Sequence, residues 1–184
     1  MYLPADFFKQ FGNAIINACE QTPIFPSVKA AQMALETGYG KSKIGNNMFG
    51  IKADGPHSPY WSGKAMSADT TEVINGKSGS YKLAFRAYNS IADSIRDHTY
   101  FLLQNSRYRK AGVFTAKTPE DQARALQAAG YATDAGYAQK LIQIIERYRL
   151  KSLDEKKKRM KTIELSIASV LLIIAGYFLY KNFK

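Results

Sequence analysis

Apolar residues recur at helical spacing along most of residues 1–150. Pro4 can open a first helix, whose apolar face would consist of Phe8, Phe11, Ile15 and Cys19. The place of Cys19 in this stripe favours a small packed side chain over a nucleophile. A second, Ala-rich helix is predicted from Val28 to about Glu36, with Ser27 as its N-cap and Gly38 after its end.

Two further helices are indicated by capping signals. Ser90 and Thr118 each stand three residues before an aspartate, which is the spacing of a capping box ahead of an apolar run. The last helix of this region would bury one apolar face, made of Tyr137, Leu141, Ile144, Ile145 and Tyr148.

Residues 50–88 follow a different pattern. They are rich in Gly, Pro and Ser and then alternate between apolar and polar positions on both sides of the dipeptide Asn75-Gly76. This pattern predicts a small β-hairpin inserted in a helical domain. The expected fold class is therefore α+β, mainly α.

The C-terminal 34 residues change character twice. Residues 151–161 are strongly basic and are predicted to be a linker, whereas residues 162–181 are predicted to be a transmembrane helix followed by a short tail, 182–184. Eighteen residues from Ile163 to Tyr180 would rise ~27 Å, close to the ~30 Å hydrocarbon thickness of a bilayer. The first residues lack the apolar region of a secretory signal peptide. The expected arrangement is a domain of residues 1–150 held by a single-pass C-terminal anchor in a lipid membrane.

Composition excludes several classes of function. The net charge is +11, of which residues 151–184 contribute +5 and residues 1–150 a diffuse +6 without an Arg-rich helix, so nucleic acid is not an expected partner. A single cysteine excludes an internal disulfide framework. Cys19, His57 and His98 lack paired metal-ligand spacing, so neither a metal nor another cofactor is expected. What remains are carboxylates set beside glycines and aromatic residues, as in a sugar-cleaving groove.

Glu36 stands out among the carboxylates because it ends the second predicted helix. The helix dipole and unpaired carbonyls at that end disfavour a negative charge and would hold the carboxyl protonated to a higher pH. A general acid needs such a shift to protonate a leaving glycosidic oxygen. The alternative is a solvated glutamate at a helix end.

Four ordered motifs resemble those of glycoside hydrolase family 73, the peptidoglycan-cleaving endo-β-N-acetylglucosaminidases of autolysins and flagellar rod-cap hydrolases. They are AAQMALETGYGKS at 30–42, NNMFGIK at 46–52, FRAYNS at 85–90 and GYATDAGY at 130–137. The resemblance covers roughly residues 5–149 and implies a lysozyme-like, two-lobed domain. It departs from the family at Ala135, where proline is usual.

The resemblance implies roles for individual residues. Glu36 would be the catalytic general acid and Glu72, in the hairpin, the second catalytic carboxylate, although a solvent-facing glutamate is the alternative for Glu72. Tyr131 would line the groove and present its hydroxyl to the substrate's acetamido group. The other candidate substrate-binding residues are Tyr39, Asn47, Phe49, Trp61 and Tyr137, of which Trp61 could equally anchor the hairpin lobe and Tyr137 the core.

The expected function is hydrolysis of the β-1,4 bond between N-acetylglucosamine and N-acetylmuramic acid in peptidoglycan by a membrane-anchored enzyme. A muramidase or lytic transglycosylase on the same fold, and a non-catalytic glycan-binding membrane anchor, are the alternatives. The visible lack of a signal peptide and the basic flank conflict with an extracellular substrate. A bacteriophage enzyme carried in a virion membrane, or a protein of the bacterial cell envelope, would each resolve that conflict.

Overall fold

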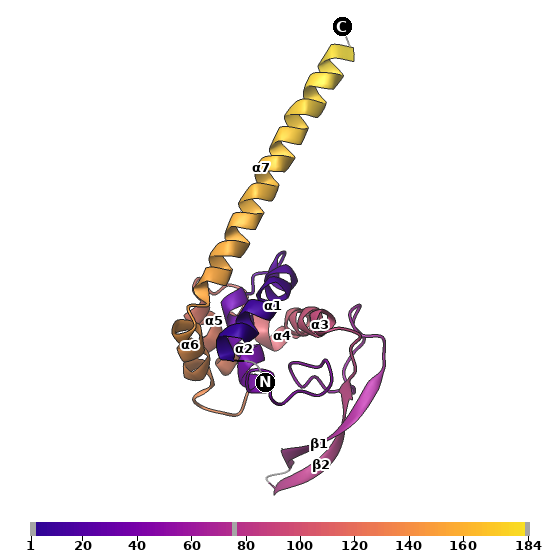
Figure 1. Cartoon of the computed structure of the whole chain (residues 1–184), viewed down its shortest axis with the longest axis vertical. Helices are drawn as coiled ribbons and strands as arrows, with labels where there is room; N and C mark the ends of the chain where they lie inside the picture. Colours follow the sequence, from indigo (N-terminus) through magenta and orange to yellow (C-terminus); the bar gives the residue numbers. More distant parts are fainter. Residues whose placement is uncertain (1–2, 75–76, 183–184) are drawn as a thin grey trace.

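A helical body carries a two-stranded hairpin on one side, and one long helix projects from it, away from the hairpin (Figure 1). The computed structural model describes residues 3–74 and 77–182, with the side chains of these ranges other than 71–78, 176–177, 180 and 182. The elements, in chain order, are α1 (Pro4–Cys19), α2 (Pro26–Thr37), β1 (Ala65–Ile74), β2 (Lys77–Arg86), α3 (Ile91–Gln104), α4 (Ser106–Lys110), α5 (Pro119–Ala128), α6 (Tyr137–Arg147) and α7 (Lys151–Asn182).

The helix α2 lies at the centre of the body and contacts α1, α5, α6 and α7. Its small side chains allow neighbouring helices to approach closely, and five of its apolar residues are fully buried: Val28, Ala30, Ala31, Met33 and Ala34. The core around it is completed by apolar faces of α1, α3 and α6, as the spacing predicts. Cys19 is buried in this core, which raises the pKa of its thiol to about 11 and leaves it inert as a nucleophile.

Two of the predicted helix caps are confirmed. The Ser90 and Thr118 hydroxyls accept hydrogen bonds from the backbone N–H groups of Asp93 and Asp121, both at 3.1 Å. The prediction of Ser27 as the N-cap of α2 is wrong, because the helix already begins at Pro26 with Phe25 as its N-cap. The Ser27 N–H instead donates to Asp154 Oδ1 at 2.8 Å, an acceptor 127 residues away.

The hairpin prediction is confirmed. The strands β1 and β2 pair antiparallel, from Ala65 opposite Arg86 to Ile74 opposite Lys77; the predicted turn residues Asn75 and Gly76 lie outside the described residues. The inner end of β2 is joined to the loop after α2, since Arg86 N–H donates to Ile51 O and Ala53 N–H to Ala84 O, both at 2.9 Å. A mainly helical domain with one small antiparallel sheet matches the expected lysozyme-like architecture.

Residues 151–161 are not a separate linker but the first third of α7, which runs without a break to Asn182. This part lies against the body. Lys157 Nζ donates to the carbonyls of Thr22 and Ile24 at 2.7 and 3.0 Å, and Lys156 Nζ donates to Asn13 Oδ1 at 2.8 Å. The basic run therefore contributes to the fold of the domain, because several of its charges are used to dock the helix.

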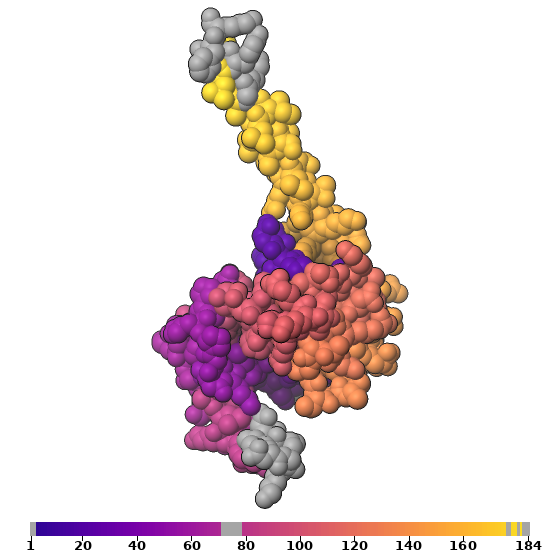
Figure 2. All heavy atoms as spheres, turned by 180° about the vertical axis from the view of Figure 1, so that it is seen from behind, coloured from indigo at the N-terminus to yellow at the C-terminus, as the bar shows by residue number. Residues whose placement is uncertain are grey.

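The outer part of α7 projects from the body (Figure 2). Its large apolar side chains at 163–174 and 178–179 are exposed, Leu172 and Ile173 by more than 70%. The predicted transmembrane helix of residues 162–181 is not confirmed: within the described residues, no helix combines the length and the apolar character needed to cross a bilayer.

Candidate active site

A cavity of about 570 Å³ opens between the helical body and the loop that leads to the hairpin. It is lined by residues of α2, α3, α4, the inner end of β2 and the loops after α2 and α5. The lining residues are Glu36, Phe49, Gly50, Ile51, Lys52, Asp54, Gly55, Arg86, His98, Phe101, Arg107, Tyr108, Tyr131, Ala132 and Thr133.

Glu36 enters this cavity because α2 stops directly after it. Gly38 adopts a left-handed conformation with φ 53°, which a residue without a side chain accepts at little cost. The N–H of Tyr39 then reaches back to Ala34 O at 2.9 Å, and the Thr37 hydroxyl accepts from Gly40 N–H at 2.8 Å. These bonds fix the last turn of the helix and therefore the position of Glu36.

The surroundings of Glu36 raise the pKa of its carboxyl to about 7, and the cause is loss of hydration in the hollow. The residue as a whole is exposed to the open cavity, so water and substrate reach it. A raised pKa for Glu36 agrees with the prediction from the sequence. The cause differs, because the prediction attributed it to the helix end, whereas the structure attributes it to burial by the cavity wall. A carboxyl with this pKa holds its proton to near-neutral pH, as a general acid must.

Two stacked tyrosines lie beside Glu36. The rings of Tyr131 and Tyr137 are 5.3 Å apart and inclined by 24°. Burial, and then the neighbouring Glu36 carboxyl, raise the pKa of Tyr137 above its ordinary value; burial, Tyr137 and Glu36 do the same for the pKa of Tyr131. Tyr131 lines the cavity, whereas Tyr137 is buried behind it and accepts a hydrogen bond from Gln32 Nε2 at 3.1 Å. Of the pair, Tyr131 is thus the residue available to a substrate.

Phe49 and Asn47, both predicted to bind substrate, lie in different environments. Phe49 lines the cavity, and its ring stacks on His98 at 3.8 Å between centroids. Asn47 is buried beneath the loop, where its amide donates to Ile51 O at 2.9 Å and its carbonyl accepts from Ile51 N–H at 3.2 Å. Asn47 is thus a scaffold for the cavity floor and does not line it.

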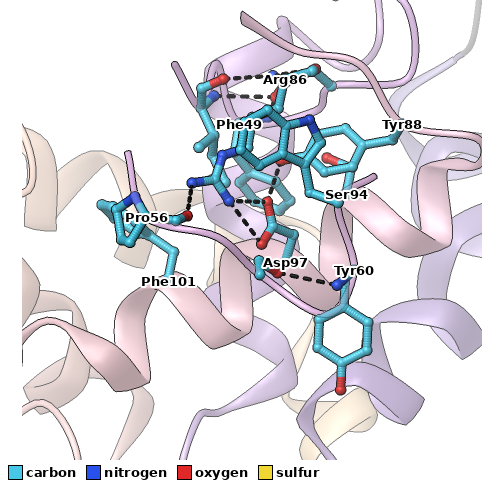
Figure 3. Close-up of polar contacts among 12 residues, drawn as sticks. Phe49, Pro56, Tyr60, Arg86, Tyr88, Ser94, Asp97 and Phe101 are labelled. Carbon is cyan, nitrogen blue, oxygen red and sulfur yellow. Dashed lines mark hydrogen bonds and ion pairs between the residues drawn. The ribbon is translucent and has the colours of Figure 1, made fainter. Parts of the chain in front are cut away.

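A buried ion pair secures the hairpin to α3. Figure 3 shows the Arg86 guanidinium directed at Asp97, with Nη1 2.9 Å from Oδ2, while Nη2 donates to Pro56 O at 2.6 Å. Trp61 packs on the same guanidinium at 4.3 Å and donates through Nε1 to Lys64 O at 2.6 Å. Trp61 is therefore an anchor of the hairpin lobe, and the prediction that it binds substrate is not supported, because it lies outside the cavity lining.

Comparisons with known proteins agree with this geometry. Residues 12–150 match the family model described as Glucosaminidase, mannosyl-glycoprotein endo-beta-N-acetylglucosaminidase. The chain belongs to the glucosaminidase family. This domain is 36% identical to the peptidoglycan hydrolase FlgJ of Salmonella typhimurium, over 87% of this chain and 50% of FlgJ. It is 32% identical to the exo-glucosaminidase LytG of Bacillus subtilis, over 80% of this chain and 52% of LytG.

Solved structures of the family share the fold of this glucosaminidase domain. The catalytic domain of the autolysin Auto from Listeria monocytogenes superposes with a TM-score of 0.71 at 32% identity, covering 84% of this chain and 89% of that domain. The chain spans about half the length of the curated relatives FlgJ and LytG.

Two predicted site residues remain, and the cavity adds a carboxylate that was not predicted. Tyr39 does not line the cavity; it packs against Phe7, Phe8 and Tyr148 and so belongs to the core of the glucosaminidase domain. The catalytic role of Glu72 stays a prediction, since its side chain lies outside the described residues. Asp54 lines the cavity as well, although no motif in the sequence marks it as a site residue.

Lys29 and His98 lie next to the cavity residue Tyr131, although neither is among the site residues predicted from the sequence. Lys29 Nζ lies 2.6 Å from His98 Nδ1, and His98 Nε2 lies 2.8 Å from the Tyr131 hydroxyl. The sequence does contain one signal for Lys29. It is a lysine inside a buried, Ala-rich helix, and it stands seven residues before Glu36 and therefore on nearly the same face. The contact with α3 could not be seen in the sequence, because nothing in the spacing brings Lys29 to His98.

Proposed function

We propose that this protein hydrolyses peptidoglycan at the β-1,4 bond between N-acetylglucosamine and N-acetylmuramic acid, with Glu36 as the general acid. The observation that carries the proposal is the Glu36 carboxyl, with a pKa raised to about 7, in the cavity of a glucosaminidase-family domain. Glu36 would protonate the glycosidic oxygen as the bond to the sugar breaks.

The cavity offers the other features that such a substrate requires. Aromatic rings of Phe49 and Tyr131 supply apolar faces for sugar rings, and the Tyr131 hydroxyl supplies a polar group beside the acid. Lys52 and Arg107 line the same cavity and place positive charge where lactyl and peptide carboxylates of the wall polymer would lie.

A second carboxylate would activate water, attack directly, or support the substrate's own acetamido group, depending on its distance from Glu36. We propose Glu72 for this position on the strength of the family resemblance. Asp54, which lines the cavity with Glu36, is the competing candidate. Comparing E72Q with D54N tests the choice.

The test is digestion of purified peptidoglycan by the whole chain, followed by reduction and mass spectrometry of the fragments. The whole chain is required because α7 supplies hydrogen bonds to the body. Fragments with reduced N-acetylglucosamine ends, formed by the wild type and at least 100-fold more slowly by E36Q, are expected. E146Q is the matched control, since Glu146 is exposed and outside the cavity.

Other products would reject the proposal in distinct ways. Reduced muramic acid ends would identify a muramidase, and anhydro-muramic ends a lytic transglycosylase. Binding to the wall without cleavage, by a chain whose thermal unfolding is cooperative, would identify a non-catalytic anchor.

We further propose that the outer part of α7 attaches the domain to a lipid membrane. Large apolar side chains are exposed at 163–174 and 178–179, and the exposed basic residues Lys158, Arg159 and Lys161 stand beside them, where anionic headgroups would lie. The setting of that membrane, in a virion or in a bacterial envelope, stays a prediction.

Co-sedimentation with vesicles tests this attachment. The chain should bind vesicles containing anionic lipid more strongly than neutral ones, and I167D/L171D should abolish binding without changing cleavage of soluble glycan fragments. Equal recovery of both proteins with vesicles, or assembly of the wild type into a defined oligomer that excludes lipid, would reject it.

A further inference from the structure

Three polar side chains from three different elements form a continuous line into the cavity. Lys29 lies on α2, His98 on α3 and Tyr131 in the loop before α6; the two contacts measure 2.6 and 2.8 Å. Lys29 and His98 are 0% and 1% exposed, so water does not compete for their hydrogen bonds. The line ends at a hydroxyl that lies beside Glu36.

The order of donors along this line is set by chemistry. A lysine ammonium has three N–H donors and no acceptor, so His98 Nδ1 must accept from it. A neutral imidazole with an accepting Nδ1 carries its proton on Nε2, and that N–H then donates to the Tyr131 oxygen. The Tyr131 proton is consequently left for another acceptor, and Tyr131 is one of the residues that line the cavity.

Loss of the ammonium would remove this order. A neutral Lys29 amine can accept from Nδ1–H, and His98 Nε2 then becomes an acceptor for the Tyr131 hydroxyl. In that arrangement the Tyr131 proton points to the protein interior and is withdrawn from the cavity.

We propose that Lys29 is a positioning residue that acts through His98 to direct the Tyr131 hydroxyl proton into the cavity. The recipient of that proton is the substrate's acetamido carbonyl, a step that rests on the proposed function. Lys29 touches no part of the substrate; it sets the imidazole tautomer from behind the cavity wall.

The charges around the line agree with this role. Burial, and then the Lys29 charge, lower the pKa of His98 well below its usual value, so the imidazole stays neutral. Burial lowers the pKa of Lys29 to about 7, and the facing Cys19, a smaller effect, acts in the opposite direction. The ammonium lies 5.4 Å from the centre of the Phe49 ring, a favourable cation–π position. Glu36 also keeps its proton up to about pH 7, so both groups are protonated over the same range.

Nitrogen-15 NMR of the imidazole tests the tautomer directly. The chain contains two histidines, so H57Q leaves His98 as the sole imidazole signal. His57 is exposed and outside the cavity lining. Below pH 6.5 we expect the neutral Nε2–H tautomer, and adding K29M should produce a substantial Nδ1–H population. An Nδ1–H tautomer in the chain with Lys29, or an unchanged Nε2–H tautomer in K29M, would overturn the proposal.

A double-mutant cycle tests the consequence for catalysis. K29M should lower kcat about tenfold, in keeping with the loss of one well-placed hydrogen bond, and change KM less than twofold. In a Y131F background, which has no hydroxyl to direct, K29M should change kcat less than twofold. An equal loss in both backgrounds would show a general packing effect and overturn the proposal.

The two measurements fail independently. If the chain proves inactive on peptidoglycan, the proposed function fails while the NMR experiment still decides the tautomer. If K29M does not fold, the tautomer of H57Q below pH 6.5 decides alone: Nε2–H supports the proposal and Nδ1–H overturns it.

Discussion

The raised pKa of Glu36 predicts how the rate of cleavage depends on pH. A general acid works in its protonated form, so kcat/KM should be constant below pH 7 and fall as pH rises through the pKa of about 7. The sign is opposite to that of a catalytic base, whose activity would increase over the same range.

The magnitude follows from the position of the pKa. At pH 7, a glutamate carboxyl with its ordinary pKa of 4.5 would be about 0.3% protonated, whereas one with a pKa of about 7 is half protonated, a gain of about 150-fold in the active form. Above pH 7 the protonated fraction of Glu36 falls about tenfold per pH unit, so this titration alone should bring kcat/KM at pH 9 to about 1% of its plateau.

The assay is the initial rate of release of reducing ends from purified peptidoglycan between pH 5 and 9.5, at constant ionic strength. Circular dichroism at each pH verifies that the chain stays folded. E36Q provides the reference, because its residual rate should lack the tenfold fall per pH unit that Glu36 causes and keep only the loss, about tenfold in total, that accompanies deprotonation of Lys29 near pH 7.

A different profile would refute the reasoning. A rate that falls from pH 5 would mean that the carboxyl has an ordinary pKa and that the cavity does not reduce its hydration. A rate that stays level to pH 9 in the wild type would mean that Glu36 is not the acid whose protonation limits cleavage.

Four other substitutions test the framework of the site and the choice of its second carboxylate. D97N should leave the Arg86 guanidinium buried without its ion partner and lower the free energy of unfolding by about 3–5 kcal/mol, measured by urea denaturation; a loss below about 1 kcal/mol would show that the pair does not anchor the hairpin. G38A should cost about 1–2 kcal/mol because alanine disfavours φ 53°, and thermal unfolding checks this. E72Q should lower kcat less than E36Q does, and D54N less than E72Q; the reverse order in the reducing-end assay would move the second carboxylate to Asp54.

Local signals in the sequence predict most of the fold. The spacing of apolar residues and the two capping boxes at Ser90 and Thr118 depend on neighbours within one or two turns, and they are sufficient for the helices that they start. A local capping signal at Ser27 predicts the wrong start for α2. The acceptor for the N–H of Ser27 is the Asp154 carboxylate, which lies 127 residues away and cannot be read from local sequence. Pro26, with its fixed φ, is the local signal for the true start.

The site is predictable where a single residue carries the chemistry and not where residues meet across the fold. Glu36 can be selected from its place at a helix end, and Phe49 and Tyr131 from the resemblance. Trp61 and Tyr39 are aromatic residues in or near the family motifs, but Trp61 packs on Arg86 and Tyr39 on Phe8, so both stabilise the fold. The juxtaposition of Lys29 with His98 depends on the packing of α2 against α3, which no pattern within either helix specifies.

The docking of α7 has a consequence for how mechanical force reaches the catalytic centre. The helix that ends just after Glu36 begins with an N–H bound by Asp154, and the adjacent carbonyls of Thr22 and Ile24 are held by Lys157. A force on the projecting part of α7 is therefore transmitted to the N-terminal end of α2, about two to three helical turns from Glu36. Truncating the chain at residue 150, where the family match ends, would remove α7. The N-terminal end of α2 would then lose the hydrogen bonds that Asp154 and Lys157 supply to it and to the preceding loop.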